Sequence, residues 1–308
     1  MKLGIHLPQS GAAGDPALLR DFAQMAEGLG FDSLWVSDHV VHPRQGDDTH
    51  PIGAAHGSLP AEHPWLEALT AMSYVAAVTE RAQIGTAVLV LPQRNPVLVA
   101  KQLATVDVLS RGRLVLGAGI GWWAEEFEAL GTPFRDRGRR MDEYLEVIRQ
   151  CWTEDHPSFQ GKYYLLGDVG FFPKPVQRPR PPVWIGAYSS PGFRRAGSAG
   201  DGLFLSRTPP AQIPAAWQET IAAARSAGRD PAALTLTSFA RLRWETEHEI
   251  ATSVETLKAL AAAGVQHIVL QFNTGVNPHP LSGPDGDMRA ATRYVERFWN
   301  VVRPAAGF

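Results

Sequence analysis

The chain has 308 residues, 44% hydrophobic and 19% charged, which is enough for one large globular domain with a substantial core. Its net charge is −2 and its Lys and Arg residues are scattered, so we expect no nucleic-acid or membrane partner. A single cysteine excludes a disulfide framework, and the lack of a signal-peptide pattern or a long apolar run predicts a cytoplasmic protein.

Short β-branched runs alternate with longer amphipathic stretches along the chain, a pattern typical of a parallel sheet with helical crossovers. Eight such units predict an α/β fold, a single (β/α)8 TIM barrel over residues 1–308. Helices are clearest over Pro16–Leu29, between Asp15 and Gly30, and over Pro96–Leu109. Strands are expected over 3–7, 33–37, 83–88, 113–118, 183–186, 202–205, 234–242 and 266–271.

Two connections, about 40–64 and 155–182, are longer than a barrel requires. We interpret them as insertions after strands two and four, where loops face the active site, and expect lids or pocket walls there. The second contains a predicted β-hairpin arm over 159–164 and a stiff, proline-rich stretch over 173–179.

Asp38 and His39 end the second predicted strand, at the rim where barrel enzymes place their catalytic residues. A histidine there can exchange a proton near neutral pH, and a neighbouring carboxylate can orient the ring. The alternative is that Asp38 caps the following turn and His39 is an ordinary strand-end residue. Both interpretations stay open on position and chemistry alone.

A glycine-rich segment, 117–123, follows the fourth predicted strand. Its glycines allow backbone amides to approach a ligand, although the spacing is not that of a dinucleotide fingerprint, and close loop packing is the alternative. Paired indoles at a rim commonly wall an apolar pocket, so Trp122 and Trp123 are candidates for that role.

A second loop, 185–192, follows the fifth strand and leads into a helix. Ser189, Ser190 and nearby amides can hold a phosphate at the helix N-terminus, although an ordinary N-cap is the alternative. The two loops occupy equivalent positions in successive units, so one phosphate-bearing cofactor can span both. The cofactor-binding candidates in these loops are Gly119, Ile120, Gly121, Gly186, Ala187, Tyr188, Ser189, Ser190 and Pro191.

We expect no metal site. His42, His50, His56 and His63 crowd one loop, but their spacing is irregular and matches no known ligand motif. A serine-hydrolase elbow is also missing from the strand-to-helix turns.

Several segments in this order and spacing resemble one family. They are 26–39, 94–107 and 113–122, completed by 139–144 and 173–177. The chain resembles the luciferase-like monooxygenase superfamily, and within it the branch of probable coenzyme F420-dependent oxidoreductases.

The resemblance implies that Asp38 and His39 lie at the cofactor ring, with His39 exchanging the proton at the substrate. It also implies a non-prolyl cis peptide between Ala87 and Val88, next to Thr86, which supports the ring from behind. The ribityl phosphate region would lie against 119–121 and 187–191. Trp35, Trp122 and Trp123 would shape the substrate pocket.

Trp122 stands where the sugar-phosphate dehydrogenases of the family carry a glutamate, which favours an apolar substrate. We therefore predict hydride transfer between coenzyme F420 and a small apolar molecule. The main alternative is an FMN-dependent monooxygenase that uses reduced flavin and oxygen. More remote alternatives are a metal-dependent barrel hydrolase and a cofactor-free binding protein. The resemblance also implies a homodimer formed through barrel helices.

Overall fold

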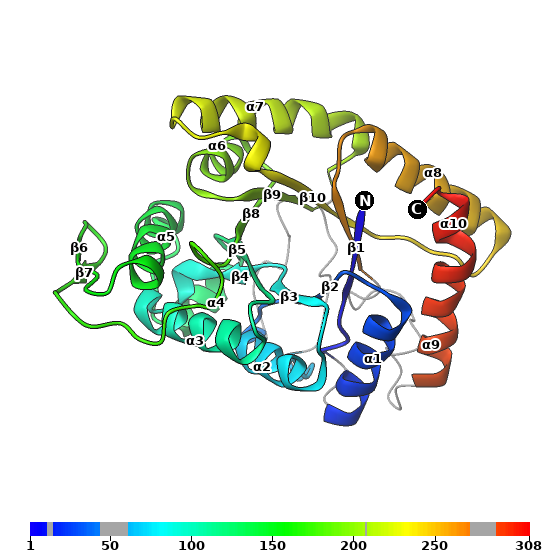
Figure 1. Cartoon of the computed structure of the whole chain (residues 1–308), viewed down its shortest axis with the longest axis horizontal. Helices are drawn as coiled ribbons and strands as arrows, with labels where there is room; N and C mark the ends of the chain where they lie inside the picture. The colour runs from blue at the N-terminus through cyan, green and yellow to red at the C-terminus, as the bar shows by residue number, and fades with distance from the viewer. Residues whose placement is uncertain (11–14, 44–60, 207, 272–287) are drawn as a thin grey trace.

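The computed structural model describes residues 1–10, 15–43, 61–206, 208–271 and 288–308. Parallel strands form a closed barrel and helices surround it (Figure 1). This arrangement confirms the predicted (β/α)8 barrel.

The barrel strands are short and almost completely buried. Their order around the barrel is β3-β2-β1-β11-β10-β9-β8-β5-β4, and a further pairing between β3 and β5 closes it. Strands β3 and β4 flank residues 87 and 88 and both pair with β5, so together they occupy one position in the barrel. The strands are β1 (Lys2–His6), β2 (Ser33–Val36), β3 (Gln83–Thr86), β4 (Leu89–Val90), β5 (Leu114–Gly119), β8 (Val183–Ala187), β9 (Gly202–Leu205), β10 (Thr235–Ala240) and β11 (His267–Leu270).

Several of the expected strands end one or two residues early, among them the second and the seventh. The second stops at Val36 rather than residue 37, because the Ser37 amide donates to the Gln9 side chain instead of a neighbouring strand. The seventh covers Thr235–Ala240 rather than 234–242. In both segments the residues beyond the end of the strand form part of the barrel rim.

The two helices predicted most clearly have the predicted bounds and caps. Asp15 accepts a hydrogen bond from the Ala17 amide, and Asn95 accepts from the Val97 amide. Gly30, at φ 103°, ends the first helix in the left-handed region that favours glycine. The α-helices are α1 (Pro16–Leu29), α2 (Ala68–Val78), α3 (Pro96–Leu109), α4 (Ala124–Ala129), α5 (Arg137–Thr153), α6 (Ser190–Ala199), α7 (Ile213–Ser226), α8 (Glu247–Ala262), α9 (Met288–Arg297) and α10 (Arg303–Ala305). Shorter helical turns are η2 (Leu91–Gln93), η3 (Pro210–Gln212), η4 (Pro231–Ala233) and η5 (Phe298–Val302).

The connection 155–182 contains the predicted hairpin, formed by β6 (Phe159–Gln160) and β7 (Leu165–Leu166), which projects beside α5 in Figure 1. Its predicted role as a pocket wall is wrong. The connection follows helix α5 rather than a strand, and Gln177 donates to the Leu114 carbonyl at the amino end of β5. Its last part therefore lies at the amino end of the barrel, whereas its hairpin lies along α5, with the Tyr164 hydroxyl 3.3 Å from Asn95 Oδ1 at the start of α3. No residue of 155–182 lines the cavity at the carboxyl ends of the strands. Most of the other predicted insertion, 44–60, lies outside the described residues.

The barrel interior is filled by aromatic side chains. Trp35 is fully buried, stacks on Trp184 at 5.3 Å between ring centroids, and meets the edge of Phe204. This corrects the expectation that Trp35 shapes the substrate pocket, because a strand residue pointing inward below the rim belongs to the core. The Trp35 indole donates to the Ser33 hydroxyl, which also bonds to His267. Burial lowers the pKa of His267 to about 3, so the ring is neutral.

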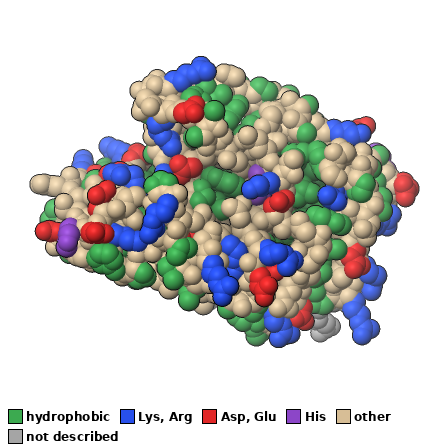
Figure 2. Space-filling model, in the orientation of Figure 1, with side chains coloured by type: hydrophobic (Ala, Val, Ile, Leu, Met, Phe, Trp, Pro, Cys, Tyr) green, Lys and Arg blue, Asp and Glu red, His purple; other side chains and the backbone are tan. Residues whose placement is uncertain are grey.

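Charged side chains of both signs are interspersed over the face of the molecule seen in Figure 2. None of the helices in the described part of the chain combines the length and apolar character needed to cross a membrane.

Candidate functional site

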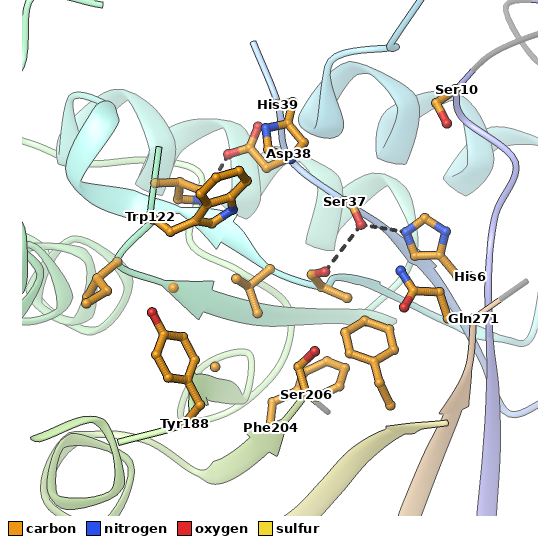
Figure 3. Close-up of a pocket in the computed structure, with 18 of the residues that line it drawn as sticks. His6, Ser10, Ser37, Asp38, His39, Trp122, Tyr188, Phe204, Ser206 and Gln271 are labelled. Carbon is orange, nitrogen blue, oxygen red and sulfur yellow. Dashed lines mark hydrogen bonds between the residues drawn. The ribbon is translucent and has the colours of Figure 1, made fainter. Parts of the chain in front are cut away.

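A cavity opens where the barrel strands end, and residues at or just beyond the end of every barrel strand contribute to its wall. Figure 3 shows Trp122 and Tyr188 on one side and His6, Ser10 and Gln271 on the other. The carboxyl ends of barrel strands carry the active sites of TIM-barrel enzymes, so this cavity is the candidate site.

Val88 forms part of the cavity wall, directly after a cis peptide bond between Ala87 and Val88. The structure thus has the predicted cis bond. A Cβ atom on Gly119 would lie 2.3 Å from Val88 Cγ2, and one on Gly186 would lie 2.7 Å from Val88 Cγ1. Only glycine lets β5 and β8 approach this turn so closely. Ala87, Val88 and the two glycines therefore form a wall section, here called the Val88 platform, whose apolar surface suits a planar ring.

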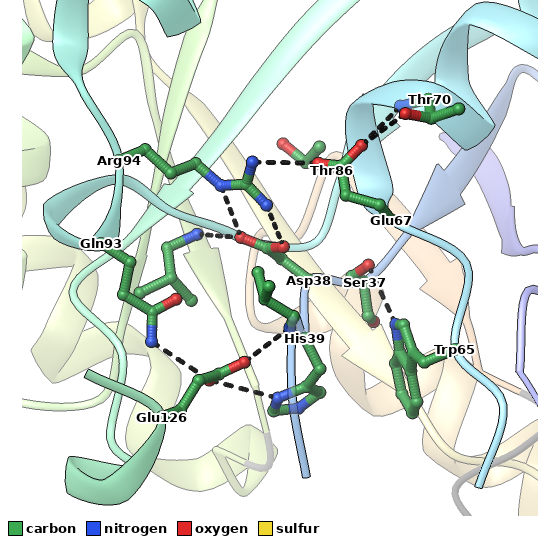
Figure 4. A network of polar contacts seen from close by, with 12 residues as sticks. Ser37, Asp38, His39, Trp65, Glu67, Thr70, Thr86, Gln93, Arg94 and Glu126 are labelled. Atoms are coloured by element: carbon green, nitrogen blue, oxygen red, sulfur yellow. Dashed lines mark hydrogen bonds and ion pairs between the residues drawn. The ribbon is translucent and has the colours of Figure 1, made fainter. Parts of the chain in front are cut away.

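Asp38 lines the cavity, but its carboxylate is fully buried and its oxygens are bound within the protein. It accepts hydrogen bonds from Arg94 Nη2 at 2.6 Å and from the Val90 amide at 2.9 Å (Figure 4). Burial raises the pKa of Asp38, and Arg94 opposes the rise. Asp38 therefore ties the end of β2 to the turn that follows the Val88 platform.

His39 lines the cavity, and its ring lies against a buried carboxylate. Its Nδ1 atom is 3.5 Å from Oε2 of Glu126, which α4 places there (Figure 4). Glu126 also accepts hydrogen bonds from the Val40 amide at 2.7 Å and from Gln93 at 3.1 Å. Burial acts to raise the pKa of Glu126, but His39, Val40 and Gln93 hold it below its ordinary value. An ionised Glu126 thus faces the ring.

Aromatic side chains surround the remaining faces of His39. The Trp65 ring meets it edge-on at 5.0 Å between centroids. Trp122 and Trp123 stack at 5.1 Å and 6°, but only Trp122 lines the cavity. Trp123 lies behind it and is buried, so its predicted place in the pocket wall is corrected to a supporting one.

Several predicted cofactor contacts lie away from the cavity wall. Thr86 is buried and donates to the Gly117 carbonyl at 2.7 Å, so it links β3 to β5. Ser190 starts α6, where its hydroxyl bonds to Glu219 and Arg194. Of the described residues, those lining the cavity in the two predicted loops are Gly119, Ile120, Gly121, Trp122, Gly186, Ala187 and Tyr188, without Ser189, Ser190 or Pro191.

Sequence reasoning missed Glu126, Arg94 and His6. Two acidic residues in the first turn of α4 are typical of any helix N-terminus, and nothing in the sequence separates Glu126 from Glu125. Arg94 stands in a proline-bracketed turn whose composition predicts only a cap. His6 could have been predicted as a site residue from the sequence. It is a polar residue at the end of β1, and Asp38 and His39 lie in the same way just after the end of β2.

Within the described residues, no group of three or more His, Cys, Asp or Glu side chains is arranged to hold a metal ion. His42 and His63 pack beside Trp65, while His50 and His56 lie outside the described residues.

Comparisons with known proteins agree with this geometry. The F420-dependent glucose-6-phosphate dehydrogenase of Amycolatopsis mediterranei (strain U-32) is 38% identical over 195 residues, which cover 62% of this chain and 54% of that protein. The chain spans about half the length of this and of another curated relative that it matches.

Two solved structures share the fold over 99% of both chains. They are an F420-dependent secondary alcohol dehydrogenase in complex with an F420-acetone adduct, at 20% identity and a TM-score of 0.75, and monooxygenase RslO1 from Streptomyces bottropensis, at 21% and 0.74. A family model described as luciferase-like monooxygenase matches residues 1–298. The chain belongs to the luciferase-like monooxygenase family.

Proposed function

We propose that this protein is an oxidoreductase that transfers hydride between coenzyme F420 and a small, largely apolar organic substrate. One observation carries the proposal: a histidine backed by a buried carboxylate shares a cavity with the Val88 platform. The names of the F420-dependent relative and structural neighbour support the choice of cofactor.

The residues of the cavity fit such a cofactor. The Val88 platform presents an apolar surface to a flat ring, and side chains larger than hydrogen at Gly119 or Gly186 would displace it. Gly121, at φ 74°, is held by Arg137, which donates to its carbonyl at 3.1 Å. The backbone of 119–121 and the segment from Ala187 to the start of α6 would hold the chain that leads to the phosphate.

Coenzyme F420, when bound, supplies a two-electron hydride carrier. The side chains of the protein hold and transfer the proton that accompanies the hydride. A carboxylate against Nδ1 favours the His39 tautomer with hydrogen on that atom, so Nε2 is the nitrogen that exchanges a proton with the substrate. Asp38 acts indirectly, by fixing the strand end that carries His39 and the turn beyond Val88.

The wall next to His39 is mainly apolar. Trp65 and Trp122 meet the His39 ring edge-on and shield it from water, and Phe204 and Phe239 also line the cavity. A polar sugar phosphate would leave many hydroxyl groups unpaired against these rings. This composition supports a small apolar reacting group.

An FMN-dependent monooxygenase is the second candidate, favoured by the structural likeness to monooxygenase RslO1. The same platform accepts either ring, whereas the reactions differ because flavin reacts with oxygen and deazaflavin reacts with it poorly.

We also propose a cytoplasmic homodimer. The exposed Leu98 and Leu109 on α3 supply apolar surface on a barrel helix. Light scattering after size-exclusion chromatography measures the molar mass directly, and a monomer at micromolar concentration would contradict the dimer.

The role of His39 is tested by His39→Ala, assayed with reduced F420 and a panel of small ketones. We expect turnover to fall by about 10²–10⁴-fold, the usual contribution of a positioned acid or base, while F420 affinity stays within a factor of about two. His63→Ala is the control, because His63 packs near Trp65 without lining the cavity. Turnover unchanged in His39→Ala would refute the role.

A further inference from the structure

Arg94 joins the two ends of the connection between β2 and α2. Its Nε and Nη2 atoms donate to the Asp38 carboxylate, just after β2, at 3.3 Å and 2.6 Å. Its Nη1 atom lies 2.9 Å from Oε1 of Glu67, the residue that caps α2 (Figure 4). One guanidinium therefore bridges two carboxylates that are far apart in the chain.

This bridge is largely shielded from water. The Arg94 side chain is 15% exposed and that of Asp38 is fully buried, whereas Glu67 is half-buried. Burial acts to lower the pKa of Arg94, but the two carboxylates raise it above its ordinary value. Shielded ion pairs are screened by salt much less than exposed ones, so the bridge holds its three side chains firmly.

Each end of the bridge lies next to an aromatic residue of the cavity wall. His39 directly follows Asp38, and Trp65 lies two residues before Glu67. The His39 and Trp65 rings meet edge-on at 5.0 Å between centroids. A change in the separation of the two carboxylates would therefore change how these rings meet.

Gln9 closes the same connection by separate contacts. Its Oε1 atom accepts from the Ser37 amide at 2.5 Å, and its Nε2 atom donates to the Leu66 carbonyl at 3.0 Å. Gln9 binds only backbone atoms there, whereas Arg94 holds the side chain of the residue before His39. Loss of the Arg94 bridge should therefore displace the His39 ring and leave the connection closed.

From these contacts we infer that Arg94 is a positioning residue of the site. By bridging the two carboxylates, it fixes His39 and Trp65 against each other in the cavity wall. A planar guanidinium suits this role because its fork binds two carboxylates at once, whereas an ammonium group is a single point of charge. The inference rests on the proposed function for its effect on turnover, but the placement of the His39 ring can be measured without a cofactor.

Carbon–proton NMR spectra of protein with labelled histidines report the surroundings of each imidazole, because neighbouring indole rings shift its signals. The His39 signal is identified by its absence in His39→Ala. We expect it to move in Arg94→Lys, which keeps the charge and loses the fork, and in Glu67→Gln, which keeps an oxygen to cap α2.

Turnover with reduced F420 and small ketones should fall by about ten- to a hundredfold in Arg94→Lys, as for a displaced catalytic group. The affinity for F420 should stay within a factor of about two, because Arg94 does not line the cavity. Glu67→Gln leaves the contact of Arg94 with Asp38 in place, so it keeps the test decisive if Arg94→Lys does not fold.

Arg180→Lys is the matched control. Arg180 makes the same two-bond contact with Asp201, its side chain is also 15% exposed, and it lies shortly before β8 at the amino end of the barrel. The His39 signal and the turnover should be unchanged in this variant.

An unmoved His39 signal in Arg94→Lys or in Glu67→Gln, or an equal movement in Arg180→Lys, would overturn the inference. Absence of F420-dependent turnover in the unsubstituted protein would contradict the proposed function and not the role of Arg94, because the His39 signal is measured without cofactor.

Discussion

At the scale of single residues, the contact between His39 and Glu126 is the feature that gives the site its chemistry. Glu126 is 2% exposed and uses its oxygens on the Val40 amide, Gln93 and His39. A buried carboxylate in this position fixes the orientation of the ring.

Glu126→Gln removes that charge and keeps the shape. We expect turnover to fall by about tenfold or more, as for other groups that orient a ligating or catalytic histidine, with little change in F420 affinity. The free energy of unfolding should change much less than the turnover, because the amide oxygen can still accept the hydrogen bond from Val40.

Glu128→Gln is the control, since Glu128 is exposed on the same helix. A rate loss that is matched by a large fall in the free energy of unfolding would indicate that Glu126 serves folding and not the ring.

Residue identity at the site was only partly predictable. Asp38 and His39 were found because two ionisable groups directly follow an apolar strand, but the sequence does not reveal that the Asp38 carboxylate faces Arg94. Glu126 reaches the cavity from the first turn of α4, where no local pattern separates it from Glu125. Arg241, which also lines the cavity, directly follows β10 and could have been predicted from that position, as Asp38 and His39 were. Trp35 was predicted at the rim because it lies only two residues before the end of the expected strand, 33–37. The sequence does not show that its side chain is buried in the barrel core.

At the scale of elements, glycines set how closely the strands approach the central tryptophan. A Cβ atom on Gly85, in β3, would lie 2.3 Å from the Trp35 ring. The indole is fully buried and cannot move away without displacing Trp184 or Phe204.

Gly85→Ala should therefore lower the free energy of unfolding by about 1–3 kcal/mol through overpacking. Gly28→Ala provides the opposite case, because no atom lies within 4 Å of the added methyl group on α1. That variant should be stabilised by roughly 0.5–1 kcal/mol through helix propensity. Urea denaturation measures both, and equal effects of the two substitutions would contradict this account of the barrel core.

The bounds of the helices were easier to predict from the sequence than the place of a long connection in the barrel. An N-cap aspartate or asparagine followed by proline placed the starts of α1 and α3 to the residue, because caps depend on local chemistry. The role of 155–182 was misjudged because the long helix α5 intervenes after the fourth barrel strand, which turns a loop after a strand into a loop before one. Counting helices as well as strands in that interval would have shown that the connection leads into β8 and does not follow β5 directly.

At the scale of the whole molecule, two buried histidines link stability to pH. Folding lowers the pKa of His6 from 6.5 to about 4 and that of His267 from 6.5 to about 3, mainly through burial. Between those values and 6.5 the unfolded chain binds more protons, so stability rises with pH in this window.

The free energy of unfolding should accordingly fall as pH drops from about 6.5 toward 4, with His6 contributing roughly 3 kcal/mol once the pH is below its folded pKa. Urea denaturation at a series of pH values measures the slope. His267→Asn should make it shallower, although the substitution also destabilises the barrel at neutral pH. A slope identical to that of the unsubstituted protein would contradict the assignment of a neutral His267.

The identity of the cofactor decides the reaction class, so a parallel fluorescence titration with F420 and with FMN is the most direct test. We predict micromolar affinity for F420, much weaker binding of FMN, and loss of F420 affinity in Gly186→Ala, where the added Cβ would lie 2.7 Å from Val88. Micromolar affinity for FMN without measurable binding of F420 would contradict the proposed function.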